Sequence, residues 1–373
     1  MAARLGLRIP LQIAAYRGHG DARGVELCGR VLARPGMDGA QDDAHWWHNL
    51  RDTYRRFANR KVPHARLRVT FQGACAEPIC DREGYYHAEL VPQSALTPQL
   101  WADAAVCLAD GRLPTPQPVL QIAADAAFGV ISDIDDTILH TGIASLRTTA
   151  QLTFLHNART RKPLCGVAAL YRALKSGAAG AAGHHRHPLF YVSSSPWNLY
   201  DLLDDFIGHN AIPCGPIFLR DFGIERGKFI ATRGHGHKLD RAIALIERYP
   251  HLRWVLAGDS GQADAELYAE AAQAYPQRIA AIYIRDVDPD HDSPLDQAVD
   301  AHIERVSGTS VPMLRAPDSL AMAEHAHALG LIDGSALALV AADVRRDRAR
   351  PDAGEAMVDA ALGRASENSA SND

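Results

Sequence analysis

Up to about residue 120, the chain consists of short runs in which apolar and polar residues alternate. In Leu67–Phe71 the alternation is strict, with Leu, Val and Phe on one side and Arg and Thr on the other. A period of two is typical of strands that bury one face, and Gly, Pro and Asp residues separate the runs as turns do. We therefore predict that residues 1–120 form a smaller, mostly β, sandwich-like domain.

After residue 125 the pattern changes to near-continuous apolar runs that alternate with helical periodicity. A strand needs such a run when helices cover both faces of a parallel sheet. Between the runs, apolar residues recur at helical spacing, as from Leu199 to Ile207. We predict an α/β domain over residues 125–345 with a doubly wound, Rossmann-like parallel sheet. The predicted strands are 128–134, 187–195, 215–221, 253–260 and 279–287.

Four segments depart from these patterns. Three prolines in 113–120 indicate a linker between the domains, because proline stiffens a chain and offers no N–H to a strand ladder. The interval 140–186 is longer than an ordinary crossover and ends in a Gly- and His-rich stretch that is typical of a loop. Aromatic residues at helical spacing in 45–61 predict one amphipathic helix with a basic remainder. Residues 346–373 have the composition of a disordered tail.

Composition narrows the class of protein. A chain of 373 residues with 47% hydrophobic and 22% charged residues is an ordinary globular protein that exceeds one core. The net charge of −5 argues against nucleic acid as a partner, since phosphate-binding domains are usually basic. No apolar run reaches the roughly 18 residues of a membrane-spanning helix. The first residues lack a secretory signal pattern and the cysteines are scattered, so we predict a cytoplasmic protein with free thiols.

Polar residues end the predicted strands at the edge where doubly wound sheets bind their ligands. Asp133 and Asp135 follow the first strand, Ser193 ends the second and Asp259 the fourth, with Lys238 on the helix before it. Clustered carboxylates repel one another unless a cation lies among them, and Mg²⁺ binds one or two carboxylates together with phosphate oxygens. The pattern therefore predicts a Mg²⁺ site between Asp133 and Asp259.

The same residues supply the groups that phosphate ester chemistry needs. A carboxylate beside a cation can attack phosphorus. Asp135 can donate a proton to the leaving alkoxide and later take one from water. Ser193 and Lys238 can bind the transferring phosphoryl oxygens.

Four motifs in order carry a family resemblance: DIDDT at Asp133–Thr137, FYVSSSP before Trp197, Lys238 in HKLDRAI, and GDSGQAD at Gly258–Asp264. Together they resemble the signature of the haloacid dehalogenase superfamily. Within that superfamily, residues 125–290 resemble the catalytic domain of the actin-patch-associated phosphatidate phosphatases and their bacterial relatives. The β-rich segment before them also fits the layout of the bacterial relatives.

The resemblance implies a phosphomonoesterase that forms an aspartyl-phosphate on Asp133, with Asp135 as general acid and base. It implies Mg²⁺ bound by Asp133, by Asp259 and by the backbone carbonyl of Asp135, with Asp264 in support. It also implies that the long segment 140–186 forms a small cap over the site. Of the three serines in FYVSSSP, Ser193 is favoured as the phosphate-binding hydroxyl. The remaining candidates are Asp136, Thr137 and Ser194 as supporting residues, and Trp197, Asn198 and Arg220 as substrate-binding residues.

The expected substrate is phosphatidate or a related lipid phosphate, and the basic segment 45–61 suggests peripheral contact with an anionic membrane. Three alternatives stay open. One is a phosphatase of a soluble phosphomonoester. Another is a D-x-D glycosyltransferase in which Asp133 and Asp135 hold Mn²⁺ and a nucleotide sugar, which leaves Lys238 without a role. The third is a lipid-binding protein without catalysis. Histidines at 184–187 and 235–237 lack companion ligands, and we interpret them as solvated.

Overall fold

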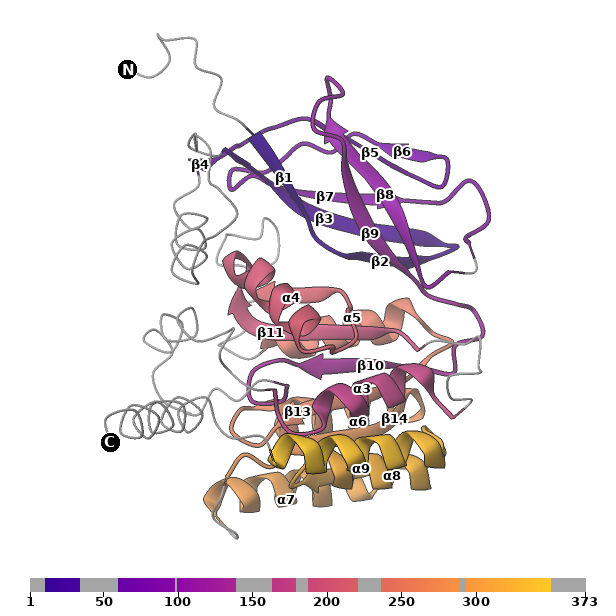
Figure 1. Cartoon of the computed structure of the whole chain (residues 1–373), viewed down its shortest axis with the longest axis vertical. Coiled ribbons are helices and arrows are strands. Elements are labelled where there is room, and N and C mark those ends of the chain that lie inside the picture. Colours follow the sequence, from indigo (N-terminus) through magenta and orange to yellow (C-terminus); the bar gives the residue numbers. More distant parts are fainter. Residues whose placement is uncertain are drawn as a thin grey trace, which may run out of the picture.

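The computed structural model describes residues 11–33, 60–97, 99–138, 163–178, 187–220, 236–288 and 293–349. These residues form a β-rich domain and an α/β domain, one above the other in Figure 1. β9 (Thr115–Gln121) is the last strand of the β-rich domain, and β10 (Phe128–Asp133) is the first strand of the α/β domain. Within the described ranges, no helix is both long and apolar enough to cross a membrane.

Six parallel strands form the sheet of the α/β domain, in the order β12-β11-β10-β13-β14-β15. The chain starts at the central strand β10, builds outward to one edge, and then returns to build the other half. The predicted α/β class with a parallel sheet is confirmed, and β15 is a sixth strand beyond the five predicted. The bounds are β11 (Leu189–Pro196), β12 (Ile217–Arg220), β13 (Arg253–Asp259), β14 (Ile279–Arg285) and β15 (Met313–Ala316).

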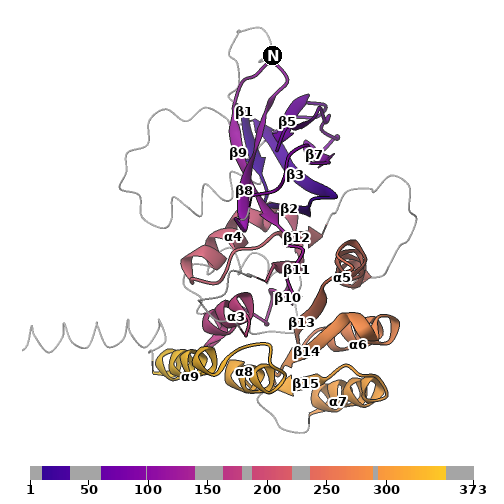
Figure 2. The ribbon, with the colours of Figure 1, turned by 90° about the vertical axis from the view of Figure 1, so that its right-hand side faces the viewer.

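Helices cover both faces of this sheet (Figure 2). Neighbouring residues of β10 point to opposite faces, so Val130 packs into one apolar cluster and Ile131 into another. The first cluster includes α3 (Val167–Ser176), α4 (Tyr200–His209), α8 (Ser319–Ala328) and α9 (Gly334–Arg348). The second includes α5 (Gly236–Arg248), α6 (Asp264–Ala274) and α7 (Pro294–Ser307). Short 3-10 helices, η3 (Trp197–Leu199) and η4 (Pro276–Arg278), precede α4 and β14.

The nine strands of the β-rich domain are hydrogen-bonded into one sheet. β5 has the predicted alternation, with Leu67, Val69 and Phe71 buried. The prediction of a mostly β domain holds, but two separate sheets, as in a sandwich, are not what the described residues form. β3, ten residues long, pairs with four other strands and joins the two halves of the sheet. The bounds are β1 (Leu11–Ala15), β2 (Gly18–Asp21), β3 (Gly24–Ala33), β4 (Arg60–Lys61), β5 (Leu67–Phe71), β6 (Ala74–Ala76), β7 (Tyr85–Leu90) and β8 (Trp101–Leu108).

The proline-rich stretch 113–120 is not a linker, and this prediction was wrong. Most of it forms β9, which pairs with β8 and, in parallel, with β2. Within β9, only Val119, Leu120 and Gln121 pair with β2. Pro116 and Pro118 therefore lie where β9 has one partner, and a strand tolerates proline where no second ladder needs the missing N–H.

Two predicted segments lie largely outside the described residues. Within the predicted cap at 140–186, the described helix α3 belongs to the layer that covers the sheet, and its Tyr171 hydroxyl is 2.6 Å from the Ser132 hydroxyl of β10. The cap itself stays a prediction. The helix predicted at 45–61 falls outside the described residues, apart from Arg60–Lys61, which form β4.

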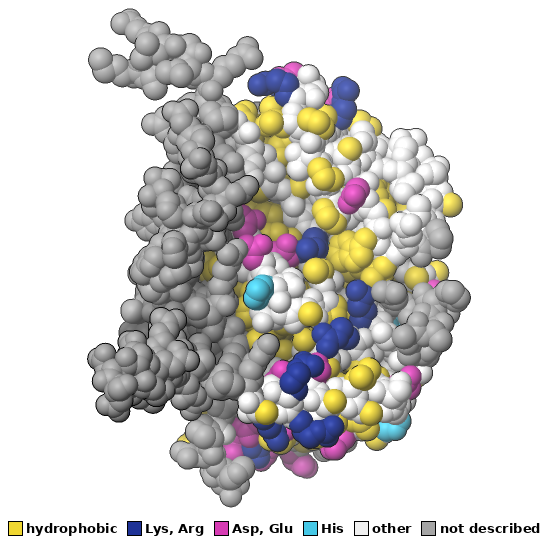
Figure 3. Space-filling model, in the orientation of Figure 1, with side chains coloured by type: hydrophobic (Ala, Val, Ile, Leu, Met, Phe, Trp, Pro, Cys, Tyr) yellow, Lys and Arg dark blue, Asp and Glu magenta, His cyan; other side chains and the backbone are white. Residues whose placement is uncertain are grey.

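The first residues of the tail predicted from residue 346 are helical, because α9 continues to Arg348. Arg346 forms an ion pair with Asp343 one turn before it, and the Asp347 carboxylate accepts a hydrogen bond from the Gly166 N–H. Lys and Arg side chains form a band over the part of the surface where α3 and α9 lie (Figure 3). Composition did not indicate that this ion pair and this hydrogen bond hold the last turn of α9. The rest of the predicted tail lies outside the described residues.

One histidine prediction was also wrong. His187, interpreted as solvated, is buried against Phe128, with ring centroids 3.8 Å apart. Its Nδ1 lies 3.1 Å from the Phe128 carbonyl oxygen. The polar neighbours of His187 in the sequence concealed that the buried strand β11 begins two residues later.

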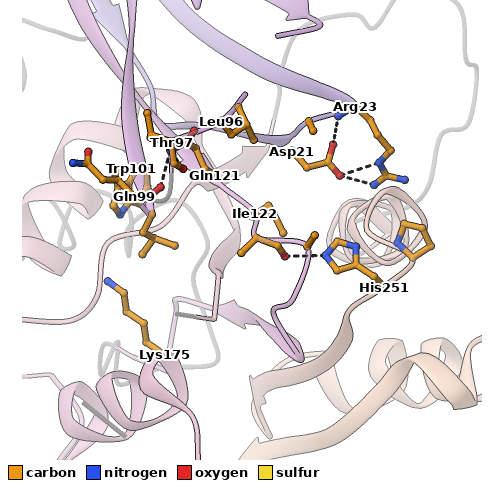
Figure 4. Close-up of a pocket in the computed structure, with 15 residues that line it drawn as sticks. Asp21, Arg23, Leu96, Thr97, Gln99, Trp101, Gln121, Ile122, Lys175 and His251 are labelled. Atoms are coloured by element: carbon orange, nitrogen blue, oxygen red, sulfur yellow. Dashed lines mark hydrogen bonds and ion pairs between the residues drawn. The ribbon is translucent and has the colours of Figure 1, made fainter. Parts of the chain in front are cut away.

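A cavity of about 970 Å³ lies where the two domains meet (Figure 4). Lys175 at the end of α3 reaches toward Trp101 of the β-rich domain on one side, and His251, bonded to the Ala123 carbonyl, lies on the other. The residues just before β10 and β13 line its floor, so the cavity opens at the amino-terminal edge of the parallel sheet. The predicted site residues lie at the opposite, carboxyl-terminal edge.

We expect Gly129→Ala to destabilise the protein by about 1–3 kcal/mol, as overpacking of a core does. A Cβ on Gly129 of β10 would lie 2.6 Å from the ring of Trp254, which is fully buried. Urea unfolding measures the change. Gly308→Ala is the matched control, because Gly308 has helical dihedrals and nothing within 4 Å of the added methyl group. Equal stabilities of the two variants would contradict this account of the core.

Candidate active site

Asp133 and Asp259 lie at the carboxyl ends of neighbouring strands. β10 and β13 pair in parallel up to Ser132 and Ala257, and both carboxylates are fully buried just beyond that pair. β10 also pairs with β11 on its other side, so the sheet order reverses at Asp133. Crevices at such reversals are the usual ligand sites of open α/β sheets. The structure thus brings together the two residues that the sequence predicts as a cation-binding pair.

Lys238 enters the same cluster from the first turn of α5. Its Nζ lies 2.8 Å from Asp133 Oδ1 and 2.8 Å from Asp264 Oδ1, and the side chain is 2% exposed. Burial alone would lower the pKa of Lys238, but the charges of Asp133, Asp264 and Asp259 raise it above its ordinary value. The lysine is therefore charged at any working pH.

The carboxyl groups respond in the complementary way. Burial raises the pKa of Asp133 well above its ordinary value, with Lys238 opposing the shift and Asp264 adding to it. Burial also raises the pKa of Asp259, and the charge of Asp264 adds to that shift. Burial and the negative charge of the neighbouring carboxylates therefore act together to raise the pKa of Asp133 and Asp259, while the same negative charge raises the pKa of Lys238. A further positive charge in the cluster would offset the excess of negative charge that one ammonium among three buried carboxylates leaves.

Asp264 begins α6 and is held close to β13 by a glycine. Its Oδ2 accepts a hydrogen bond from the Asp259 N–H at 3.3 Å. A Cβ on Gly258 would lie 2.5 Å from the Asp264 Cβ, so only glycine lets the helix start this close to the strand. With one oxygen on Lys238 and the other on the Asp259 backbone, Asp264 orients the cluster from behind, in line with its predicted supporting role.

Gln262 is a site residue that the sequence reasoning missed. Its Nε2 donates to three oxygens: Asp259 Oδ2 at 2.9 Å, the Asp135 carbonyl at 3.2 Å and Asp133 Oδ2 at 3.4 Å. Its Oε1 accepts from Lys238 Nζ at 3.1 Å. The available signal was its position inside GDSGQAD, between two aspartates that both belong to the cluster.

The three acceptors around the Gln262 amide are suited to a hard cation. Two carboxylate oxygens and one backbone carbonyl converge on a single point, and Mg²⁺ prefers such oxygen ligands. They are the set predicted from the sequence: Asp133, Asp259 and the carbonyl of Asp135. Asp133, Asp259 and Asp264 also offer oxygens that all lie within 4.8 Å of one another. We favour the first set, because both oxygens of Asp264 already have partners.

Asp135 faces the cluster from the turn after β10. Its Oδ2 accepts from Ser193 Oγ at 2.8 Å and lies 3.5 Å from Ser195 Oγ. Burial raises the pKa of Asp135, and the Ser193 hydrogen bond partly offsets the shift. A carboxyl group with a raised pKa keeps its proton longer as pH rises, as a general acid must. The structure therefore brings Asp133, Asp135, Ser193 and Lys238 to one place.

The supporting candidates from the first motif shape the turn. Asp136 has the left-handed dihedral φ of 55°, which Asp adopts more readily than most residues, and this bends the chain back after Asp135. Thr137 is buried below it. On β11, the Ser195 N–H donates to Ser193 Oγ at 2.9 Å, and Ser194 is half-buried between them. Ser193 is thus the serine that contacts both Asp135 and its own strand end.

The predicted substrate-binding residues lie beside the end of β11. Trp197 begins η3 and stacks on Tyr16 of the β-rich domain, with ring centroids 4.9 Å apart. Asn198 follows it in η3, and its side chain lies outside the described residues. Arg220 ends β12 and pairs in register with Pro196. Their contact with substrate stays a prediction.

Residues 128–286 match the family model described as the catalytic domain of phosphatidate phosphatase APP1. The chain is 35% identical over 184 residues to phosphatidate phosphatase APP1 of Saccharomyces cerevisiae, and 33% identical over 161 residues to an uncharacterised protein of Schizosaccharomyces pombe. These alignments cover 47% and 42% of this chain but only 30% and 25% of the two relatives. The resemblance predicted from the motifs is confirmed for the segment that carries the candidate site.

A solved structure, of a carbohydrate acetylesterase from Xanthomonas citri, aligns over 83% of this chain and 68% of that chain. The aligned residues are 12% identical and the TM-score is 0.28. A score this low does not indicate a shared fold.

We expect Lys238→Met to destabilise the protein by about 3–5 kcal/mol, because it removes the one ammonium from a buried group of carboxylates. Adding Asp264→Asn should restore part of the loss, since one of the repelling charges is then gone. Urea unfolding measures both variants. Lys61→Met is the control, because the Lys61–Glu83 pair is exposed and worth at most about 1 kcal/mol. A loss for Lys238→Met as small as that of the control would show that the buried cluster does not need its cation.

Proposed function

We propose that this protein is a Mg²⁺-dependent phosphatase of the haloacid dehalogenase type, a phosphoric monoester hydrolase. The observation that carries the proposal is the single cluster in which Asp133 contacts Lys238 and shares a cation-sized group of oxygens with Asp259. Asp135 and Ser193 complete it through their hydrogen bond of 2.8 Å. The order of the parallel strands, which reverses beside β10, supports a doubly wound sheet of the kind predicted.

The chain's own residues account for both halves of the reaction. Asp133 Oδ1, the oxygen beside Lys238, attacks phosphorus and forms an aspartyl-phosphate as the bond to the leaving oxygen breaks. Asp135 donates its proton to the leaving alkoxide. The Asp135 carboxylate then takes a proton from water, whose oxygen attacks phosphorus and releases phosphate and free Asp133. Ser193 and Lys238 hold the phosphoryl oxygens throughout.

Mg²⁺, when bound by Asp133, Asp259 and the Asp135 carbonyl, neutralises the charge that an anionic phosphate would otherwise meet among these carboxylates. The Gln262 amide donates to these same oxygens and would give them up to Mg²⁺, and Asp264 fixes the Lys238 ammonium on the other side. The site thus combines one permanent cation with oxygens that suit a second.

The substrate we propose is phosphatidate, converted to diacylglycerol, or a related lipid phosphate. The phosphatidate phosphatase family match over residues 128–286 and the yeast relative support this choice. We place the protein in the cytoplasm, with peripheral contact to an anionic membrane surface where the lipid lies, and in lipid metabolism. A soluble phosphomonoester is the alternative substrate, because the reacting groups recognise only the phosphate end of the molecule.

We expect Asp133→Asn to reduce phosphate release at least ~10³-fold with folding intact, because the variant lacks the attacking carboxylate. A phosphate-release assay with Mg²⁺ over phosphatidate micelles and soluble monoesters measures it. Asp240→Asn is the control, an exposed carboxylate two residues after Lys238 on the same helix. Full activity of Asp133→Asn would remove the nucleophile assignment. Turnover that requires a sugar nucleotide would favour a glycosyltransferase. Vesicle binding without phosphate release would favour a lipid-binding protein without catalysis.

We expect Mg²⁺ to raise the melting temperature, with a stabilisation of about 2.7 kcal/mol when its concentration is 100 times the dissociation constant. Chelation should reverse the effect and Asp259→Asn should abolish it, while Asp240→Asn should keep it. Gln262→Ala should lower the Mg²⁺ concentration at half effect, because its amide no longer competes for the same oxygens. An unchanged melting temperature of the wild type at millimolar Mg²⁺ would argue against the cation site.

A further inference from the structure

The segment Tyr16–His19, which leads from β1 into β2 of the β-rich domain, contacts the edge of the catalytic sheet on both faces. β12 is the edge strand of that sheet, with β11 beside it, and β2 lies directly over it in Figure 2. Tyr16 packs into the apolar cluster on one face of the sheet. Three residues on, the His19 ring contacts Phe190 and Phe218 on the other face, at centroid distances of 5.3 and 5.5 Å.

On the first face the contact is an aromatic joint, formed by Tyr16, Trp197 and Tyr200. The Tyr16 ring stacks on Trp197 at 4.9 Å and an angle of 21°, and lies 4.2 Å from the ring of Tyr200. The Arg17 N–H donates to the Tyr200 hydroxyl at 2.8 Å, and the Arg17 side chain forms an ion pair with Asp204. The aromatic joint therefore fixes η3 and the first turn of α4.

On the second face the contact is a polar joint, formed by His19, Glu26, Arg248 and Tyr249. His19 Nδ1 lies 2.6 Å from the Tyr249 hydroxyl. Arg248 at the end of α5 pairs with Glu26 at 2.5 Å and donates to the Gly24 carbonyl at 3.0 Å. This joint docks the same domain, but it lies at the far end of α5 from Lys238.

The end of β11, which precedes Trp197 in the sequence, has few regular strand contacts to hold it in place. β11 pairs with β10 only as far as Val192, and its register with β12 shifts between Val192 and Pro196. Ser193 and Ser195, which face Asp135, lie in this irregular stretch. A strand end without a regular ladder is positioned by its neighbours in the chain, and the first large side chain beyond Pro196 is that of Trp197.

We propose that Tyr16 is a positioning residue for the active site: through Trp197 it fixes the strand end that carries Ser193 and Ser195. The β-rich domain then helps to position the phosphate-binding residues without contacting the phosphate itself. The inference about catalysis rests on the phosphatase function proposed above, whereas the inference about strand position does not. Displacements of about 1 Å of a positioned group can reduce a rate by roughly 100-fold, so a small movement of the serines is sufficient.

The test compares three variants of the full chain. Tyr16→Leu keeps an apolar side chain but removes the stacked ring. Tyr16→Phe keeps the stacked ring and should therefore behave like the wild type. Glu26→Gln weakens the polar joint and controls for looser docking of the domain in general. Hydrogen exchange of the amides of residues 193–200 reports strand position, and KM and kcat for a chromogenic aryl phosphate with Mg²⁺ report the site.

We expect Tyr16→Leu to speed exchange of these amides and to lower kcat/KM roughly 10- to 100-fold, chiefly through KM, because the serines bind the phosphoryl oxygens. Tyr16→Phe and Glu26→Gln should stay within about twofold of the wild type. Equal effects of Tyr16→Leu and Glu26→Gln, or none from Tyr16→Leu, would overturn the proposal. If Tyr16→Leu does not fold, Tyr16→Met, whose longer flexible side chain fills more of the space of the ring but cannot stack on Trp197, gives the same comparison. A wild type inactive on every monoester would refute the phosphatase, while the exchange data would still decide the role of Tyr16.

Discussion

The structure depends on how three buried carboxylates coexist with one lysine. Asp133, Asp259 and Asp264 are fully buried and Lys238 is nearly so, although burial of charge is among the most unfavourable terms in folding. The four residues come from four different elements: Asp133 ends β10, Asp259 ends β13, Asp264 begins α6 and Lys238 lies in the first turn of α5. The Gln262 amide and the backbone N–H groups of Gly261 and Asp259 donate hydrogen bonds to the carboxylate oxygens that Lys238 does not contact. The feature that makes the cluster unfavourable also prepares it for a cation and a phosphate.

Much of this site could be predicted from the sequence because parallel sheets deliver their functional residues at strand ends. An apolar run followed by Asp133, a second followed by Ser193 and a third ending in Asp259 suffice to place three residues at one edge. The alternation in Leu67–Phe71 and the near-continuous run before Asp133 likewise report burial directly. Local patterns of this kind survive folding, since they are set by which faces of a strand are covered.

Other features could not be predicted, because they depend on contacts between distant segments. Gln262 is an ordinary amide in sequence, and only the meeting of β10 and β13 gives it three acceptors. Tyr16 and Trp197 are 181 positions apart in the numbering, and their stacking is one of the contacts between the β-rich domain and the α/β domain. The prolines of β9 indicated a linker, because sequence does not show on which side a strand has a neighbour. His187 was misjudged for a similar reason: its burial is supplied by Phe128.

The position of the β-rich domain over β12 has a consequence for solubility. A parallel sheet that stops at an outer strand exposes a row of backbone donors and acceptors that can recruit a strand from another molecule. Here the segment from Tyr16 to His19 straddles that strand and packs on both of its faces. The same segment leaves a strand from another copy of the chain less space on either face of β12.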